Sequence, residues 1–321
     1  MDCQINGVSL PSQANGLIGQ EMKFLRKTVI SLVFIATGLI TSLTMTIKPA
    51  QGEASFRDPV SLQGPIVSQS LDLLTLNVAH GRGTALNQIL VSETQHRQNL
   101  DDIASILISS NAHAVALQEA DAPSLWSGEF DHVGFLAEAT GYQFAVHGHH
   151  ADSWPYTYGA ALLSRFKMGD TLSHSFRPSW PTAGKGFVRA SIQWSPNGNI
   201  AISQRVTLVS VHLDFSRKKV RDAQIAELVE DISRLTTPLI ILGDFNAEWS
   251  TEDSPVRVLA EALDLRAFRP TADELATYKD SKRLDWILIS KELDFIDYTV
   301  LPNIVSDHLA VMARIGWGVK E

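Results

Sequence analysis

Short apolar runs alternate with amphipathic segments over most of the chain. Residues 71–79 (LDLLTLNVA) are almost continuously apolar, which is typical of a buried strand. In residues 97–109 and 217–235 the apolar positions recur at helical spacing. The same reasoning predicts further strands at residues 114–120, 159–166, 186–194, 205–213, 239–244, 284–290 and 309–317, and shorter helices at 132–142 and 254–263.

The number of helices constrains how the predicted strands can be arranged. Several strands are apolar at consecutive positions, which indicates that both of their faces are covered. The predicted helices are too few to cover both faces of one sheet along its whole length. We therefore expect two sheets packed face to face with helices outside, an α/β sandwich in a single domain.

The apolar stretch nearest the N-terminus has a different character. Residues 28–47 carry no charge, follow a basic cluster and precede small residues, an order typical of an export signal. A stretch of this length also suffices for an uncleaved membrane anchor. We expect residues 1–54 to be an extension with this signal or anchor, 55–69 a linker and 70–321 the folded domain. Translation is expected to begin at Met22, which opens the basic cluster.

Composition narrows the class of protein. Hydrophobic residues make up 45% and charged residues 19%, which suits a globular domain with a sizeable core. The only cysteine is Cys3, in the extension, which excludes a disulfide and a cysteine nucleophile in the domain. The formal net charge of −8 disfavours tight nonspecific binding to nucleic acid without excluding it. We expect an exported monomer, periplasmic or secreted, with membrane association through residues 28–47 as the alternative.

Polar residues of a restricted kind stand at one end of six predicted strands. They are Asn77, Glu119, His212, Asp244 with Asn246, Asp285, and Asp307 with His308. Any one of them is compatible with an ordinary turn or cap. Together they supply the oxygen ligands that suit Mg²⁺ or Mn²⁺ and imidazoles that can donate protons or contact phosphate. We expect loops at one rim of the sandwich to bring them together.

Several other catalytic signatures are missing from the sequence. There is no G-x-S-x-G nucleophile elbow, no H-E-x-x-H helix and no G-x-x-x-x-G-K-[ST] phosphate loop. The HGHH run at residues 147–150 lacks accompanying ligands, so we interpret it as a polar loop rather than a metal site.

The motifs that carry these polar residues resemble the endonuclease/exonuclease/phosphatase superfamily. The resemblance covers roughly residues 70 to 317, through LNVAHG, ALQEAD, YGAALLSRF, VSVHLDF, LGDFNAEW, RLDWILIS and SDHLAVMARI, in that order. It implies a four-layer α/β/β/α sandwich with two mostly antiparallel sheets. It also implies metal-dependent hydrolysis of phosphate esters, with Mg²⁺ or Mn²⁺ as the cofactor.

The resemblance assigns expected roles to the metal and water side of the reaction. Glu119 is expected to be the principal metal carboxylate, with Asn77 and Asp307 assisting. Asp244 is expected to orient or deprotonate the attacking water, and Asn246 to contact the scissile phosphate. Because residues two apart in a strand point to the same side, Asp244 and Asn246 are expected to lie together, with the residue between them facing inward.

The remaining roles concern charge and protons on the substrate. His308, in partnership with Asp285, is expected to stabilise the pentacovalent phosphate. His212 is expected to donate a proton to the leaving oxygen, and its identity makes an abasic-site repair role doubtful. A missing general acid typically costs ~10²–10⁴-fold in rate.

Four further residues, Arg82, Asp131, His132 and Arg189, are weaker candidates for contacting substrate. Arg82 follows Asn77 closely and can reach a phosphate through two hydrogen bonds. Asp131 and His132 begin a predicted helix, where Asp131 is first an N-cap candidate. Arg189 and Trp154 are candidates for the rim.

Two classes of function remain open. One is an exported metal-dependent phosphoesterase acting on a phosphodiester or phosphomonoester, whether nucleic acid, phospholipid headgroup or small ester. The alternative is a noncatalytic phosphate- or lipid-binding module with the same fold. The complete polar set favours the enzyme, and the sequence leaves the substrate undetermined.

Overall fold

The computed structural model describes residues 64–196, 198 and 203–318, all of which fall in one compact unit, Pro49–Glu321. The predicted extension with its apolar segment at 28–47, Met22 and most of the predicted linker lie outside the described residues. Within the described part of the chain, no helix is both long and apolar enough to span a membrane.

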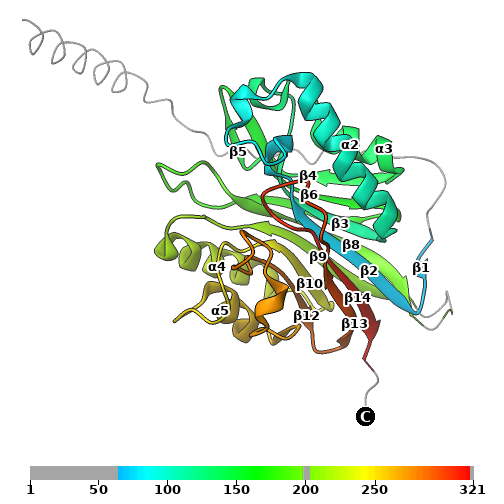
Figure 1. Cartoon of the computed structure of the whole chain (residues 1–321). Coiled ribbons are helices and arrows are strands. Elements are labelled where there is room, and N and C mark those ends of the chain that lie inside the picture. The colour runs from blue at the N-terminus through cyan, green and yellow to red at the C-terminus, as the bar shows by residue number, and fades with distance from the viewer. Residues whose placement is uncertain (1–63, 197, 199–202, 319–321) are drawn as a thin grey trace, which may run out of the picture. The chain divides into compact units, whose positions relative to one another are not determined.

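Two seven-stranded sheets form the centre of the fold (Figure 1). The first contains β1 (Ile66–Val67), β7 (Gly169–Ser175), β8 (Gly186–Ser195), β9 (Gln204–His212), β10 (Leu239–Asp244), β11 (Leu265–Ala267) and β12 (Asp285–Ser290). The second contains β2 (Ser70–Asn77), β3 (Ala114–Asp121), β4 (Phe144–His147), β5 (Ala151–Ser153), β6 (Tyr156–Ser164), β13 (Leu293–Val300) and β14 (Val311–Trp317).

The strand order explains how distant segments meet. The first sheet runs β1-β8-β9-β10-β12-β11 with β7 beside β8, and the second runs β13-β14-β2-β3-β6-β4 with β5 beside β6. Most neighbours are antiparallel, but β1 and β8, β2 and β3, and β9 and β10 are parallel pairs. The parallel pairs β2–β3 and β9–β10 lie centrally, and their carboxyl ends carry most of the predicted site.

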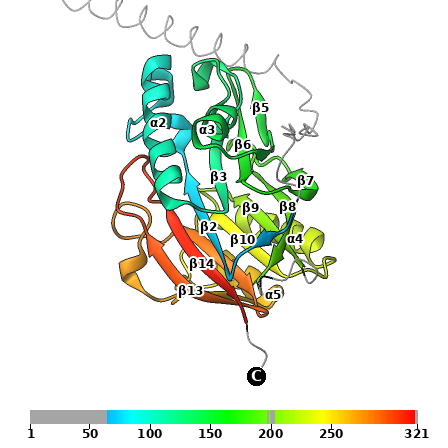
Figure 2. The same cartoon turned by 90° about the vertical axis from the view of Figure 1, so that its right-hand side faces the viewer.

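Helices cover the outer face of each sheet. Helices α2 (Glu93–Ser110) and α3 (His132–Thr140) lie on the second sheet, and α4 (Lys218–Ile232) and α5 (Pro255–Ala262) lie on the first. The connecting loops also contain the short helices η1 (Ala79–Gly81), η2 (Gln88–Leu90), η3 (Leu125–Ser127) and η5 (Asp273–Leu275). Figure 2 shows α2 and α3 on one side of the two sheets and α4 and α5 on the other. The expected α/β/β/α layering is confirmed.

Three apolar clusters match the three interfaces between layers. Leu73, Val188 and Ile240 belong to the cluster between the sheets, while Leu100 and Leu228 belong to the two outer clusters beneath the helices. Every residue of β10 is buried, as expected for a strand covered on both faces. Strands β7 and β13 were not predicted, because their half-exposed positions lack an apolar run.

The end of β10 depends on a close approach between strands. Gly243 has φ +148°, and a Cβ there would lie 2.0 Å from the carbonyl oxygen of Val211 on β9. Only glycine avoids this clash. Phe245 is fully buried, as predicted, and the following Asn246 turns the chain with φ +49°. The apolar strand and its buried anchor hold the polar tip in place.

Candidate active site

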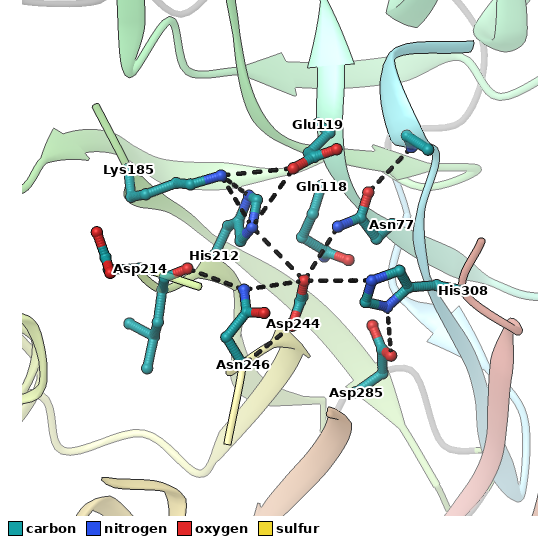
Figure 3. Close-up of polar contacts among 12 residues, drawn as sticks. Asn77, Gln118, Glu119, Lys185, His212, Asp214, Asp244, Asn246, Asp285 and His308 are labelled. Carbon is teal, nitrogen blue, oxygen red and sulfur yellow. Dashed lines mark hydrogen bonds and ion pairs between the residues drawn. The ribbon is translucent and has the colours of Figure 1, made fainter. Parts of the chain in front are cut away.

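The carboxyl ends of the parallel strands meet at one end of the sandwich. Asn77 closes β2, His212 closes β9 and Asp244 closes β10, while Asp285 opens the antiparallel strand β12. Strand register places Asp244 opposite both His212 and Asp285. From the other sheet, Nδ2 of Asn77 donates a 3.0 Å hydrogen bond to Oδ2 of Asp244. Asp244 therefore lies at the centre of the site (Figure 3).

Asp244 is 1% exposed and is surrounded by amides and imidazoles. Asn246 donates to it twice, from its backbone N at 2.9 Å and from Nδ2 at 3.2 Å. The Nε2 atoms of His212 and His308 lie 3.5 Å and 3.8 Å from its Oδ2. Burial, aided by the carboxylate of Asp285, raises the pKa of Asp244 to about 7 against the opposing charge of His308. A carboxyl group with this pKa can exchange a proton near neutral pH.

His308 is held as a positively charged group. Its Nδ1 lies 2.8 Å from Oδ2 of Asp285, which also accepts a 2.6 Å hydrogen bond from Oγ1 of Thr277. Burial opposes the charge, but the carboxylates of Asp285 and Asp244 outweigh it and raise the pKa of His308 to about 10. The imidazolium therefore persists at neutral pH.

Glu119 approaches from β3 and is flanked by cationic groups. It lies at a bulge where the register of β3 and β6 shifts, and its φ of +51° is unusual for glutamate. Its Oε1 lies 3.5 Å from Nζ of Lys185 and its Oε2 lies 3.3 Å from Nε2 of His80. Burial opposes ionisation, but His80 and Lys185 hold the pKa of the Glu119 carboxyl well below its usual range. Glu119 therefore remains a carboxylate.

Lys185 was not identified from the sequence, yet it lies inside the site. It is 6% exposed, and its Nζ lies 3.2 Å and 3.0 Å from Nδ1 and Nε2 of His212. Burial and the charge of Lys185 hold the pKa of His212 well below its ordinary value, so this ring is neutral. The only local signal is that Lys185 lies between Gly184 and Gly186, where an added Cβ would lie 2.0 Å and 2.3 Å from backbone oxygens.

His80 and Asp121 form a second pair that the sequence analysis missed. Nδ1 of His80 lies 2.7 Å from Oδ1 of Asp121, and both side chains are buried. Although burial lowers it, the carboxylates of Glu119 and Asp121 raise the pKa of His80 above its ordinary value. The pair sits behind Glu119 and fixes where its carboxylate points. Both residues lie in quoted motifs, LNVAHG and ALQEAD, but only the fold shows that they meet.

The predicted metal ligand Asp307 contacts the weaker candidate Arg82. Nη2 of Arg82 lies 2.6 Å from Oδ2 of Asp307, which places both residues at the rim. Ser306 ties this segment to β2, because its Oγ donates a 2.7 Å hydrogen bond to the carbonyl oxygen of Asn77.

Three weaker candidates lie elsewhere or serve the fold. Arg189 points away from the site, because its Nε pairs with Asp231 of α4 at 2.9 Å. His132 is fully buried, and its Nε2 lies 2.9 Å from the carbonyl oxygen of Ser127. Asp131 occupies the N-cap position of α3 but makes no side-chain capping hydrogen bond. None of these positions supports a contact with substrate.

The HGHH run is also more structured than expected. His147 ends β4 and is buried with His150, so the segment is not an exposed polar loop. Burial, aided by neighbouring histidines, lowers the pKa of His147 to about 4 and that of His150 to about 3. Both rings are therefore neutral at physiological pH.

The donor chemistry of the site suits a hard divalent cation. Among the described residues, one buried group of three His, Cys, Asp or Glu side chains can hold a metal ion, formed by Asp244, Asp285 and His308, whose ligand atoms all lie within 4.8 Å of one another. Oδ1 of Asp285 is buried there with no hydrogen-bond partner. The predicted ligands Glu119 and Asp307 instead contact cationic side chains. Among the described residues, the structure thus brings one set of possible ligands together, and it pairs Glu119 and Asp307 with cationic side chains that a bound cation would have to displace.

Comparison with known proteins places this geometry in context. The sequence matches the family model described as the endonuclease/exonuclease/phosphatase family over residues 74–308, a span that contains every residue of the site. No curated protein matches the chain.

Solved structures resemble the chain at low sequence identity. An endonuclease/exonuclease/phosphatase from Beutenbergia cavernae DSM 12333 is 18% identical with a TM-score of 0.60, over 78% of this chain and 72% of that one. A mannosyl-6-phosphatase from Bacteroides thetaiotaomicron VPI-5482 is 15% identical with a TM-score of 0.56, over 77% and 100%. The human nocturnin catalytic domain with bound sulfate is 21% identical with a TM-score of 0.56, over 84% and 100%. These likenesses establish the fold.

Proposed function

This chain belongs to the endonuclease/exonuclease/phosphatase family, and from that premise we propose that it is a metal-dependent hydrolase that cleaves a phosphate ester with water. The environment of Asp244 carries the proposal. A binding module for phosphate needs donors and positive charge, whereas buried carboxylates repel the anion and cost affinity. Asp244 and Asp285 are both buried at the centre of the site, so the arrangement is explained by catalysis rather than by binding.

Asp244 has the properties of a general base for water. Its pKa of about 7 lets it accept a proton at neutral pH. The two hydrogen bonds from Asn246 and the one from Asn77 fix the orientation of its carboxylate. We infer that Asp244 orients the attacking water and accepts its proton.

His308 and Asn246 provide the charge and hydrogen bonds that the transition state requires. The His308 imidazolium is fixed by Asp285 and supplies positive charge where negative charge develops on the phosphate oxygens. Asn246 lies beside Asp244, and its Nδ2 donates both to Asp244 and, at 3.0 Å, to the carbonyl oxygen of Leu213, so its amide can address the same phosphate when one of these bonds is exchanged.

His212 becomes a proton donor only when substrate is present. Its neutral ring, held beside Lys185, is a poor acid in the free enzyme. A bound phosphate adds negative charge and draws the Lys185 ammonium toward its oxygens, and both effects raise the pKa of His212. His212 can then protonate the leaving oxygen. Lys185 thus binds the phosphate and couples that binding to the acid.

Glu119, with Asn77 and Asp307, would hold the divalent cation, Mg²⁺ or Mn²⁺. Glu119 stays ionised and its side chain is 19% exposed, whereas the His308 imidazolium has no lone pair to offer a metal. When bound, the cation neutralises charge on the nonbridging oxygens of the ester.

The relatives show what this fold can accommodate. One is a mannosyl-6-phosphatase, and another was solved with a sulfate anion, which has the shape of phosphate. These properties belong to those proteins, and they support phosphoester chemistry for the present chain.

Hydrolysis of bis(p-nitrophenyl) phosphate and p-nitrophenyl phosphate with Mg²⁺ or Mn²⁺ tests the proposal. Turnover should disappear with EDTA, return with added metal, and survive Asp102→Asn, which changes an exposed carboxylate on α2. A wild-type protein that binds phosphate but turns over neither ester under any metal condition would favour the binding module.

We also propose that the domain is exported, on the strength of the uncharged stretch at residues 28–47. Fractionation of cells expressing the full chain tests this. Recovery of the folded domain only from the cytoplasm would overturn it.

A further inference from the structure

Exposed apolar side chains gather at the end of the sandwich that carries the site. Trp154 and Trp180 are each 86% exposed, and Leu86 and Leu90 are 102% and 86% exposed. Most of the exposed large hydrophobic side chains of the described residues lie on loops at this end: Leu86, Ile89, Leu90, Leu125, Trp154, Trp180, Phe215 and Ile304. Exposed apolar side chains that gather at one end of a protein often mark a surface for interaction with a partner or a membrane.

Strand register places these loops around the mouth of the site. The β5–β6 hairpin leads into Tyr158, which pairs with Asp121 at the end of β3. The connection between β7 and β8 leads into Gly186, which pairs with His212 at the end of β9. The loops therefore leave the sheets where the catalytic side chains emerge.

Neighbouring loops are also tied to one another. The backbone N of Trp126 donates a 3.2 Å hydrogen bond to the carbonyl oxygen of Pro155, which joins the loop after β3 to the β5–β6 hairpin. Nη1 of Arg217 donates a 2.9 Å hydrogen bond to the carbonyl oxygen of Trp180, which joins the loop after β9 to the β7–β8 connection. The apolar tips are thus held by defined contacts.

The loops lack charge as well as exposing apolar groups. We define the rim loops as residues 84–92, 122–128, 153–158, 178–184 and 300–306, none of which contains Asp, Glu, Lys or Arg. Some loops at the opposite end of the sandwich differ, since residues 165–170 (RFKMGD) and 291–292 (KE) are rich in charge. At the site end, the loop after β10 also carries charge, with Glu248, Glu252 and Asp253. The uncharged rim loops therefore form one sector of the site end, and that sector is suited to leave water.

Cations lie next to the apolar tips. Arg177 precedes Trp180, and its side chain is 87% exposed, with Glu227 at 3.6 Å as a loose partner. Lys218 and Lys219 follow Phe215 and are exposed, and Lys218 has Asp222 of α4 as an exposed partner at 3.0 Å. No Asp or Glu occurs between residues 171 and 213 of this acidic chain. Apolar tips bordered by cations complement a surface of acyl chains and phosphate groups.

We propose that the rim loops dock this end of the protein onto the surface of a phospholipid bilayer. Tryptophan favours the boundary between headgroups and acyl chains, and lysine and arginine favour the phosphate layer. A second copy of the chain bound to the same loops would cover the site, whereas a bilayer bound there presents phosphodiesters to the site. The substrate class that follows, a phospholipid headgroup, rests on the proposed function, but the docking does not.

Quenching of tryptophan fluorescence by brominated acyl chains tests docking at the rim itself. The probe is vesicles of phosphatidylcholine and phosphatidylglycerol with brominated chains, added to the full-length protein. Residues 28–47 contain no tryptophan, so contact of that segment with lipid gives no signal of its own. We expect part of the wild-type fluorescence to be quenched, and each of Trp154→Phe and Trp180→Phe to remove a share of the quenched component.

A charge placed on an apolar tip should prevent docking without disturbing the fold. Leu86→Asp/Leu90→Asp keeps both tryptophans, and both leucines are exposed. We expect the lipid concentration for half-maximal quenching to rise at least ~10-fold, the equivalent of ~1.4 kcal/mol. Ile108→Asp, on an exposed isoleucine of α2 away from the rim, is the matched control and should leave quenching unchanged.

The outcomes separate docking from catalysis. Hydrolysis of soluble bis(p-nitrophenyl) phosphate by the Leu86→Asp/Leu90→Asp variant should match the wild type, since these leucines lie outside the catalytic machinery. Quenching without hydrolysis would leave docking intact and overturn the proposed function. Absence of quenching in the wild type would overturn docking, as would a dimer in light scattering that the Leu86→Asp/Leu90→Asp variant abolishes while vesicles have no effect.

Discussion

The site contains two carboxylates from opposite sheets whose environments differ. Glu119 on β3 faces His80 and Lys185, and its pKa is held well below the usual range. Asp244 on β10 faces amides and a second carboxylate, and burial raises its pKa to about 7. The same functional group is thus kept charged in one place and able to exchange protons in the other.

The local backbone explains why the two environments differ. β3 carries a bulge between Leu117 and Ala120 that displaces Glu119 from the regular strand, and its side chain is 19% exposed. β10 keeps its pairing register with β9 and β12 to its last residue, so Asp244 remains between two strands and is 1% exposed. The exposed carboxylate suits a cation, and the buried one suits a base.

Asp244→Asn should have the largest effect on activity of the changes predicted for these two carboxylates. The variant keeps the size of the side chain but removes the base, so kcat should fall by about 10⁴-fold, the upper range for general catalysis. Steady-state hydrolysis of bis(p-nitrophenyl) phosphate at saturating metal measures it. A fall of less than tenfold would remove Asp244 from the role of base, and Asp102→Asn is the control for handling and stability.

Glu119→Gln should act mainly on the metal. The loss of a ligand should raise the metal concentration for half-maximal activity by more than the ~10–100-fold typical of an outer-shell change, with partial rescue by excess metal. Asp285→Asn should lower kcat, because it leaves His308 without its partner, while the metal constant shifts less. If Asp285→Asn instead raised the metal concentration for half-maximal activity and Glu119→Gln mainly lowered kcat, the cation would be bound by the Asp244, Asp285 and His308 group.

Lys185→Met should have an intermediate effect. It removes the charge that lies 3.0 Å from Nε2 of His212, so the pKa of His212 should rise and phosphate binding should weaken. We expect kcat/KM to fall about 10–100-fold, in line with a charged hydrogen bond of about 1.5–3 kcal/mol. Histidine NMR titration and kinetics check both parts, with Lys185→Arg as a partial rescue and Lys167→Met, an exposed lysine, as the control.

The smallest expected effect concerns stability at acid pH. His147 and His150 have folded pKa values of about 4 and about 3, below the ordinary value of 6.5, so protons bind the unfolded chain preferentially. Their stabilising contribution is complete above pH 6.5 and is lost as pH falls toward 4. Between pH 6.5 and 5.5 these two rings together should lower the free energy of unfolding by about 2 kcal/mol.

His308 should act in the opposite direction. Its folded pKa of about 10 makes its contribution complete below pH 6.5 and lost as pH rises toward 10. Urea unfolding at several pH values measures how the free energy of unfolding changes on both the acid and the alkaline side. Because Asp244, with its raised pKa, also gains stability as pH falls, the test is the difference between wild type and His150→Gln. His150→Gln should reduce the acid slope, and a slope equal to that of the wild type would contradict the burial of a neutral His150.

Much of this architecture follows from local sequence. Consecutive apolar positions in residues 239–244 predict a strand covered on both faces, and β10 is buried throughout. Helical spacing in residues 97–109 predicts α2. The polar residues at strand ends could also be found, because Asp244 and Asn246 follow the apolar run directly and Phe245 between them is apolar.

Other features could not be predicted from one sequence. Arg189 has the charge of a phosphate ligand, but the register of β8 turns it toward Asp231 on α4. Lys185 has no motif of its own, and it enters the site because β8 begins where β9 ends. Edge strands such as β7 depend on a partner rather than on their own apolar pattern.

The sequence by itself determined eight strands, the main helices and the polar set at the strand ends, because apolar periodicity and turn chemistry act over a few residues. Only the tertiary structure decided that His80 meets Asp121 behind Glu119, that Lys185 lies against His212, and that the exposed tryptophans share one rim. These pairings join residues far apart in the chain. Since pKa values and exposure depend on such neighbours, the division of labour between Glu119 and Asp244 arises only when the two sheets pack together.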